Sequence, residues 1–313
     1  LPALAALAAL VALVLWGAWR VLEPTPEKRL VIATGPEQGA YEAWGQRYAP
    51  LLRAHGLQVE LRRTAGSADN LALLRDPASG VHAAFVQGGV AEPTEGADDG
   101  TLVSLGRVAH EPLWLFYRQD ALARLRGGQP PVRLADLAGW RVDIGPAGGG
   151  TGALLRRLAA ESGLPAAALQ PHEAVAPLRV AALVQGRVDA LALVSAADAP
   201  LVQYLLRTPG VALFDVAQAE AYARRFPFLQ PLVLPRGVVD LAADQPPADV
   251  RLVSASASLV VRAELHPALM QLLLQAAQQA HGEGGWFHRR GEFPNPGADL
   301  FPLAGEAARH YRS

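Results

Sequence analysis

The sequence predicts an α/β protein made of two similar βαβαβ lobes that are joined by crossover strands. From residue 29 onwards, short β-branched or apolar runs alternate with segments of helical periodicity. This order is typical of right-handed βαβ units with parallel strands. The order also occurs twice, since residues 80–87 resemble residues 186–195: each has a glycine, a Val-x-Ala start, an apolar run and a polar end.

The chain begins with an apolar segment, residues 1–19, that carries no charged side chain. Its length matches the roughly 20 residues that a helix needs to cross a bilayer. Trp16 and Trp19 lie at its end, where aromatic residues favour the membrane interface. We therefore expect residues 1–20 to be a transmembrane anchor, which stays uncleaved because no small-x-small site follows. Residues 21–28, with two prolines, are expected to form a stiff linker.

The first lobe is expected to comprise residues 29–112 together with 255–313. Ser67 has the character of a helix N-cap, and Asn70 follows three residues later. A pair of glycines ends the third strand of this lobe. Hydrophobic periodicity predicts strands over 30–34, 57–61 and 81–87, and helices over 40–54, from Ser67 to about 76, and over 267–280.

The second lobe is expected to comprise residues 113–254. Five glycines fall within residues 145–152, between a short strand and a helix. Such a loop lets backbone N–H groups approach a ligand at the positive end of a helix. The pattern predicts strands over 141–144, 169–172 and 188–194, and helices over 152–162 and 175–185. Residues 113–117 and 256–261 are expected to be paired crossover strands that form a hinge.

Composition excludes several classes of function. The net charge of −1 gives no basic field for nucleic acid, and the absence of cysteine removes disulfides, thiolate catalysis and zinc-thiolate sites. The eight histidines show no ligand pairing at helical spacing, and neither a nucleophile elbow nor a P-loop occurs. We therefore expect no metal, no cofactor and no enzymatic activity.

One enzyme-like pattern keeps an alternative open. Gly148, Gly150 and Ala153 follow a strand with the spacing of a dinucleotide fingerprint, and Glu173 lies about 20 residues further on. This would suit an NAD-dependent dehydrogenase. Direct binding of a nicotinamide cofactor would separate that alternative from a binding protein.

The candidate site consists of small polar residues and glycines that follow the predicted strands. Ligands of open parallel sheets bind beyond the carboxyl ends of the strands, so two facing lobes would place these residues around one cleft. Their hydroxyl, amide and backbone N–H groups suit a small polar ligand, and the helix starts favour an anion. The predicted ligand-binding residues are Thr34, Gly35, Gly39, Tyr41, Gly66, Ser67, Asn70, Gln87, Gly149, Gly150, Thr151 and Ser195.

Several motifs, taken together, resemble the TAXI family of solute receptors of TRAP transporters. They are residues 32–35 with 39–41, 64–67 with 70–71, 84–87, 134–142, 149–151 and 186–190, within a resemblance that covers residues 29–262. The resemblance implies a type II periplasmic-binding-protein fold whose lobes close on a solute, such as an amino acid or another small carboxylate. It also implies delivery of the solute to the membrane subunit of a transporter.

The same resemblance implies a single-pass protein of the bacterial inner membrane with a periplasmic body. Charge alone leaves the orientation open, because Arg20, Lys28 and Arg29 follow the span and would by themselves favour a cytoplasmic body. Pro36, Glu37 and Gln38 stand where the family is richer in glycine, and an inward Glu37 would repel an anion. A ligand-sensing or partner-binding module that uses the same cleft is the second alternative.

Overall fold

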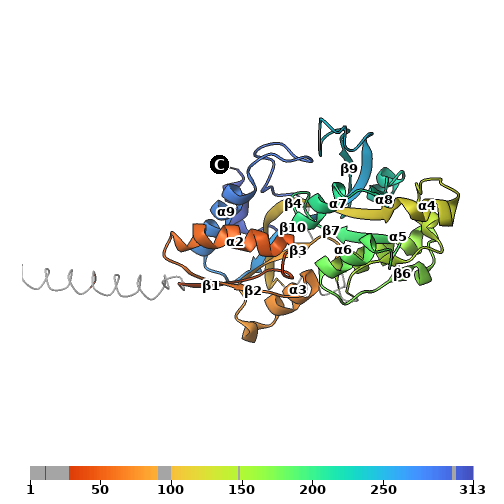
Figure 1. Cartoon of the computed structure of the whole chain (residues 1–313). Coiled ribbons are helices and arrows are strands. Elements are labelled where there is room, and N and C mark those ends of the chain that lie inside the picture. Colours follow the sequence, from red (N-terminus) through yellow and green to blue (C-terminus); the bar gives the residue numbers. More distant parts are fainter. Residues whose placement is uncertain (1–10, 12–27, 91–99, 147–148, 298–300, 313) are drawn as a thin grey trace, which may run out of the picture.

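The computed structural model describes residues 11, 28–90, 100–146, 149–297 and 301–312. Its elements form two groups that are joined by two long strands (Figure 1). Apart from residues 11 and 28, the predicted anchor and linker lie outside the described residues. Among the helices that the structure does describe, none has the length and apolar character needed to span a membrane.

The first group contains the elements predicted for the beginning of the chain. Its strands β1 and β2 are parallel to each other, and β1 is also parallel to β3. Every residue of β1 after the first is buried, as expected for a parallel strand that is covered on both faces. The group consists of β1 (Arg29–Ala33), α2 (Ala40–Arg53), β2 (Gln58–Arg62), α3 (Ser67–Arg75), β3 (Ala83–Gln87), α9 (Pro267–His281) and α10 (Gly305–His310), with a 3₁₀ turn at Pro77–Ser79.

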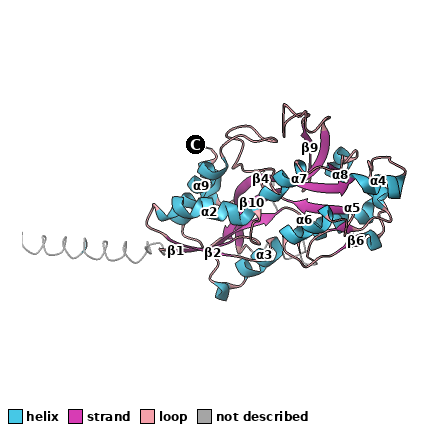
Figure 2. Cartoon of the chain, in the orientation of Figure 1, coloured by secondary structure: helices cyan, strands magenta, loops and turns pink. Residues whose placement is uncertain are grey.

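The second group repeats the parallel arrangement around β5, which pairs with β6 on one side and β7 on the other. Figure 2 shows its helices packed around these strands. The group consists of α4 (Gln119–Arg126), β5 (Val142–Asp143), α5 (Gly150–Ser162), β6 (Leu169–Gln170), α6 (Ala176–Val184), β7 (Ala190–Val194), α7 (Pro200–Leu206), β8 (Val211–Leu213), α8 (Ala219–Arg225) and β9 (Gln230–Leu234), with 3₁₀ turns at Leu134–Leu137 and Ala166–Ala168.

Two long antiparallel strands, β4 (Leu102–Arg118) and β10 (Val250–Arg262), connect the groups. The strand order is β2-β1-β3-β10-β4-β7-β5-β6, with β8 on β4 and β9 on β10. The predicted hinge segments are both strands, but they do not pair with each other as expected. Residues 113–117 pair with β7 and β8, whereas 256–261 pair with β3 and with the first half of β4. The predicted lobe boundaries fall inside β4 and β10 and remain a prediction.

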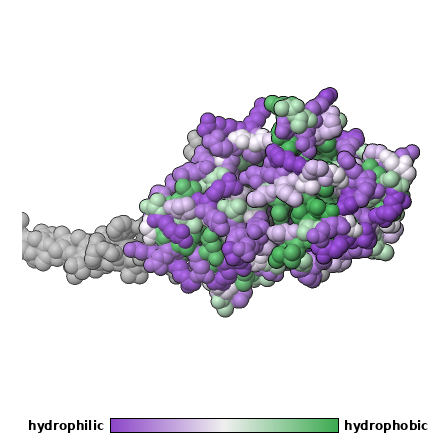
Figure 3. Space-filling model, in the orientation of Figure 1, coloured by the Kyte–Doolittle hydropathy of each residue, from purple (hydrophilic) through white to green (hydrophobic). Residues whose placement is uncertain are grey.

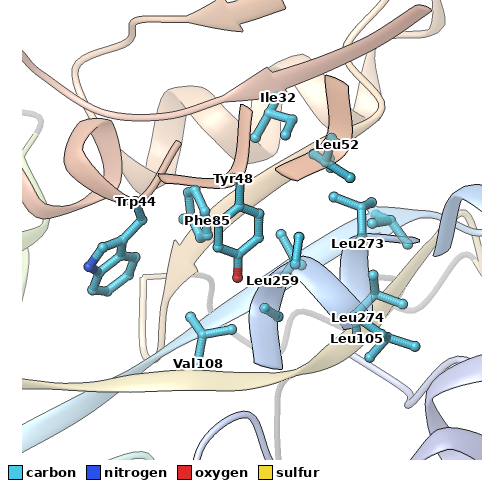
Figure 4. Close-up of a cluster of buried hydrophobic side chains, with 14 of the residues drawn as sticks. Ile32, Trp44, Tyr48, Leu52, Phe85, Leu105, Val108, Leu259, Leu273 and Leu274 are labelled. Atoms are coloured by element: carbon cyan, nitrogen blue, oxygen red, sulfur yellow. The ribbon is translucent and has the colours of Figure 1, made fainter. Parts of the chain in front are cut away.

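The hydrophobic cores of the two groups are separate. Trp44, Tyr48 and Phe85 form the aromatic centre of the largest cluster in the first group, and both Trp44 and Tyr48 contact Phe85 edge-on (Figure 4). In the second group, Trp140 packs edge-on against Tyr117 in another cluster. The strand ends between the two groups are therefore held by independent cores on either side.

Candidate functional site

The carboxyl ends of β1 and β3 face the first turns of α2 and α3, and most of the predicted residues of the first group meet there. Gly35 lies against Tyr41, because a Cβ atom on Gly35 would be 3.4 Å from the Tyr41 Cβ. Gly39 is the N-cap of α2, and Gly66, with φ of 133°, is the N-cap of α3. A residue with a side chain would be strained at Gly66. The predicted loops therefore start both helices at the same edge of the sheet.

Thr34 and Asn70 hold this edge together. Both are fully buried. The Asn70 Nδ2 donates hydrogen bonds to the carbonyl oxygens of Thr34 (2.5 Å) and Phe85 (2.8 Å), and the Thr64 hydroxyl donates to Asn70 Oδ1 (2.7 Å). The Thr34 hydroxyl donates to the Arg62 carbonyl oxygen at 3.2 Å. Because these polar atoms already have protein partners, both side chains position the loops around the site.

Tyr41, Ser67 and Gln87 form a buried chain of hydrogen bonds that leads to a residue missing from the sequence prediction, Glu111. The Gln87 backbone N–H donates to Ser67 Oγ at 2.9 Å, and Ser67 Oγ lies 3.4 Å from the Tyr41 hydroxyl. The Tyr41 hydroxyl donates to Glu111 Oε2 at 2.7 Å. Glu111 lies on β4, opposite Ala255 of β10, so the chain ends where the two groups are joined.

The Glu111 carboxyl is almost completely buried, with 3 % exposure. Burial raises its pKa from 4.5 to about 8, although the hydrogen bond from Tyr41 acts in the opposite direction. At neutral pH the carboxyl is therefore uncharged and carries a proton that it can donate. Burial and the neighbouring Glu111 also raise the pKa of Tyr41 well above its usual value. The sequence signal for Glu111 was an acidic residue two positions before the apolar, strand-like run at residues 113–117.

Residues of the second group reach the same region from the other side. A Cβ atom on Gly150, the first residue of α5, would lie only 2.7 Å from Gln87 Oε1, so Gly150 is in close contact with Gln87 across the two groups. The Thr151 hydroxyl accepts a hydrogen bond from the Val194 N–H at 3.0 Å. The Ser195 carbonyl oxygen accepts one from Trp114 Nε1 at 2.9 Å, and the Gly149 N–H donates to the Pro146 carbonyl at 2.9 Å. The structure thus brings Gln87 and Gly150 together, while Thr151 and Ser195 brace strand ends.

A buried ion pair supports the glycine loop and was also missed. Asp143 is fully buried, and its Oδ1 accepts hydrogen bonds from Arg179 Nε and from the Gly145 N–H, both at 2.8 Å. Its Oδ2 lies 2.9 Å from His172 Nδ1. Arg179, only 5 % exposed, also donates to the Ala192 carbonyl at 3.0 Å. The guanidinium is thereby paired beneath the loop, and it links β5, α6 and β7.

Glu37 does not turn toward the candidate site. Its side chain is 68 % exposed and lies 3.8 Å from the Arg63 guanidinium. Arg63 also donates to Glu42 Oε1 at 2.6 Å, and Glu42 Oε2 accepts the Gln38 N–H at 2.7 Å. These contacts fix the first loop with its acidic side chain outward, so Glu37 gives no reason to exclude an anion.

We find no candidate metal centre in the part of the chain that the structure describes. Within these residues, no group of three His, Asp or Glu side chains is arranged to hold a metal ion. The site offers hydroxyl, amide and carboxyl groups together with three helices that begin at glycines, α2, α3 and α5. That set can bind and orient a small polar molecule by hydrogen bonds.

Solved structures of similar fold come from two classes of protein. The alkanesulfonate-binding protein SsuA of Xanthomonas axonopodis pv. citri, bound to MOPS, matches with a TM-score of 0.50 and 15 % identity over 82 % of this chain and 74 % of that one. The regulatory domain of CcmR of Synechocystis PCC6803, in complex with 2-PG, matches with a TM-score of 0.52 and 14 % identity over 82 % and 98 %. A protein of Bordetella bronchiseptica RB50 gives 0.51 and 17 % over 81 % and 71 %. These structural similarities show that the chain shares the fold of these proteins.

A search of the curated proteins found no match to the sequence. The family comparison covers residues 32–278, which span both groups of elements and both sides of the candidate site. The fold, with two α/β groups joined by two long strands, is shared with the alkanesulfonate-binding protein SsuA and with the regulatory domain of CcmR. On this match, the chain belongs to the NMT1-like family.

Proposed function

We propose that this protein binds a small polar solute between its two groups of elements, which act as closing lobes, and that it does no chemistry on the solute. The observation that carries the proposal is the contact of Gln87 with Gly150 at the end of the Glu111–Tyr41–Ser67 chain. Hydrogen-bonding groups from both sides of the joining strands meet there. A solute held by both sides would favour the closed arrangement by its differential affinity.

The solute that suits this site best is a small carboxylate or a related anion. Three helices, α2, α3 and α5, begin at glycines beside the site, and helix N-termini favour negative charge. Glu111 does not oppose an anion at neutral pH, because its uncharged carboxyl can donate a hydrogen bond. The structurally similar SsuA, described as alkanesulfonate-binding, is in line with an anionic solute.

The finer parts of the proposal come from the sequence. The TAXI-like motifs support a receptor that delivers its solute to the membrane subunit of a TRAP-type transporter. The apolar residues 1–20 support a single-pass anchor in the bacterial inner membrane, with the body in the periplasm. In this proposal, the twelve predicted residues and Glu111 either line the solute site or hold its loops in position.

A thermal-shift screen of amino acids and small carboxylates on the full chain, kept in a mild detergent, tests the proposal. A true solute raises the unfolding temperature, because it binds the folded state only. Tyr41→Phe keeps the ring but removes the hydroxyl that Glu111 and Ser67 contact, and we expect it to weaken solute binding about 10-fold. Tyr204→Phe, at an exposed tyrosine of α7, is the matched control. Equal affinity in both variants contradicts the assigned site.

A sensing module is the second candidate, and one observation favours it. The regulatory domain of CcmR shares the fold, so the same clamp can serve regulation. Cross-linking in membranes separates the two, because a transport receptor contacts a transporter subunit in a solute-dependent way. The dehydrogenase alternative makes a different prediction, namely binding of a nicotinamide cofactor at Gly148, Gly150 and Glu173, which fluorescence titration with NADH would detect.

A further inference from the structure

A second cavity lies beside the candidate site and shares none of its twelve predicted residues. Its volume is about 400 Å³, within the range of small-molecule sites. The walls come from α2, β4 and α9, from the segment after β7 with α7, and from the turn after α9. They include Trp44, Val108, Ala109, Ala196, Ala197, Ala280, Trp286 and Phe287.

The inner wall of this cavity is aromatic and apolar. Trp44 is buried and stands edge-on to His281, with 5.0 Å between ring centres. Figure 4 shows Trp44 and Val108 at one edge of the core of the first group. Trp286 and Phe287 are half-buried on the turn that follows α9, and Phe287 contacts Trp114 of the joining strand β4. Flat rings on several sides favour an aromatic ligand. Pairs of aromatic rings stabilise one another by more than the burial of their apolar surface alone provides.

The polar groups around the cavity carry little net charge. At the rim, Arg47 lies 3.6 Å from Asp198, and Glu283 lies 2.9 Å from Arg290. Burial lowers the pKa of His110 to about 4, and burial together with the Arg47 charge lowers the pKa of His281 to about 3. Both imidazoles are therefore neutral at pH 7. A charged ligand would lose its hydration here without gaining an unpaired counter-charge.

His281 adds a buried polar atom that the protein leaves unsatisfied. The side chain lines the cavity and is only 8 % exposed. In the described part of the chain, its Nε2 has no hydrogen-bond partner. Buried polar groups without a partner are rare in folded proteins, and this one belongs to a side chain of the cavity wall.

We infer that this cavity is a second small-molecule site, which takes an uncharged bicyclic aromatic or heteroaromatic ligand. Such a ligand would touch Trp44 and Ala280 of the first group and Ala196 of the second group at once. The binding of this ligand is therefore coupled to the arrangement of the two groups. By linkage, the ligand changes the affinity for the solute by the same factor by which the solute changes the affinity for the ligand.

The experiment uses indole as an uncharged bicyclic probe and the full chain labelled with 5-fluorotryptophan. The six tryptophans give separate ¹⁹F resonances, which single Trp→Phe variants assign. We expect the resonances of Trp44 and Trp286 to shift in a saturable way, while that of Trp140, buried in the second group, stays unchanged. A uniform response of all three, or none at Trp44 and Trp286, overturns the inference.

Variants that fill the cavity test its location. Ala280→Phe on α9 places a ring inside the cavity, and we expect indole affinity to fall at least 10-fold. Ala268→Phe, at an exposed position of the same helix, is the matched control and should change the affinity less than 2-fold. Ala197→Phe fills the cavity from the second group and replaces Ala280→Phe if that variant fails to fold. Unchanged affinity in a folded cavity-filling variant contradicts the assignment.

Charged analogues test the ligand class. We expect indole-3-acetate and tryptamine each to bind at least 5-fold more weakly than indole, and equal binding of either one overturns the uncharged class. The solute of the proposed function binds elsewhere, so it should change the affinity for indole through the linkage without excluding indole from the cavity. A failed solute screen therefore leaves this test intact, and a failed indole titration leaves the solute proposal intact.

Discussion

Replacing the buried acid by its neutral isostere, Glu111→Gln, should remove a pH dependence of stability from the protein. Gln keeps an oxygen that can accept the hydrogen bond from the Tyr41 hydroxyl, which lies 2.7 Å away in the native protein. It has no proton to lose. The variant and the native chain then differ chiefly in the ionisation of the side chain at position 111, where β4 pairs with β10.

The direction in which stability changes with pH follows from the raised pKa of Glu111. Burial moves the pKa of Glu111 from 4.5 to about 8, so between these values the folded chain holds a proton that the unfolded chain has lost. Stability from this group is complete below pH 4.5 and is lost as the pH rises through 8. One proton changes the free energy of unfolding by about 1.4 kcal/mol per pH unit, so an interval of about 3.5 units gives at most about 5 kcal/mol.

Urea unfolding of both chains at pH values from 4.5 to 8.5 measures the effect. The difference between native and variant free energies of unfolding cancels all groups that they share. We expect the native chain to lose several kcal/mol relative to Glu111→Gln across this range. Glu264→Gln, with a side chain 78 % exposed, is the control and should give a flat difference. A flat difference for Glu111→Gln as well would refute the assignment of a buried neutral carboxyl.

Three further predictions concern contacts around the site. Gly150→Val should displace the flexible Gln87 amide, because a Cβ there would lie 2.7 Å from Gln87 Oε1, and we expect weaker solute binding in the thermal-shift assay. Asn70→Ala should lower the free energy of unfolding by about 2–4 kcal/mol in urea titrations, since the buried carbonyl oxygens of Thr34 and Phe85 each lose the hydrogen bond from the Asn70 amide. Arg179→Met should cost about 3–5 kcal/mol by isolating the buried Asp143 carboxylate, and adding Asp143→Asn should recover part of that loss.

Local patterns were sufficient for several regular elements of the chain, whereas α4, α7, α8, β8 and β9 have no counterpart in the prediction. The strand that became β3 and the helix that became α2 have strong periodicity, and the structure places both within one residue or two of the prediction. The pairing of the hinge segments was predicted incorrectly, because register between distant strands is not encoded in either segment alone. β4 is 17 residues long and contacts β10 with one half and β7 with the other, and a local pattern cannot show that division.

Glycines at the starts of helices could be recognised from the sequence, and the structure gives Gly66 a positive φ and brings Gly150 close to Gln87. Their part in ligand binding stays a prediction, and contacts that depend on long-range burial could not be predicted from local patterns.

Glu111 and Arg179 were missed because their neighbours in sequence look ordinary, and their partners Tyr41 and Asp143 are 70 and 36 residues away. An acidic residue in a core strand is nonetheless a usable signal. A carboxyl at such a position must either find a cation or remain protonated. Glu111 has a tyrosine hydroxyl as its partner in place of a cation, and burial keeps its carboxyl protonated at neutral pH although the hydrogen bond from Tyr41 lowers the pKa. The proposed anionic solute would be repelled by the deprotonated Glu111 carboxylate, so solute affinity should fall as the pH rises past 8.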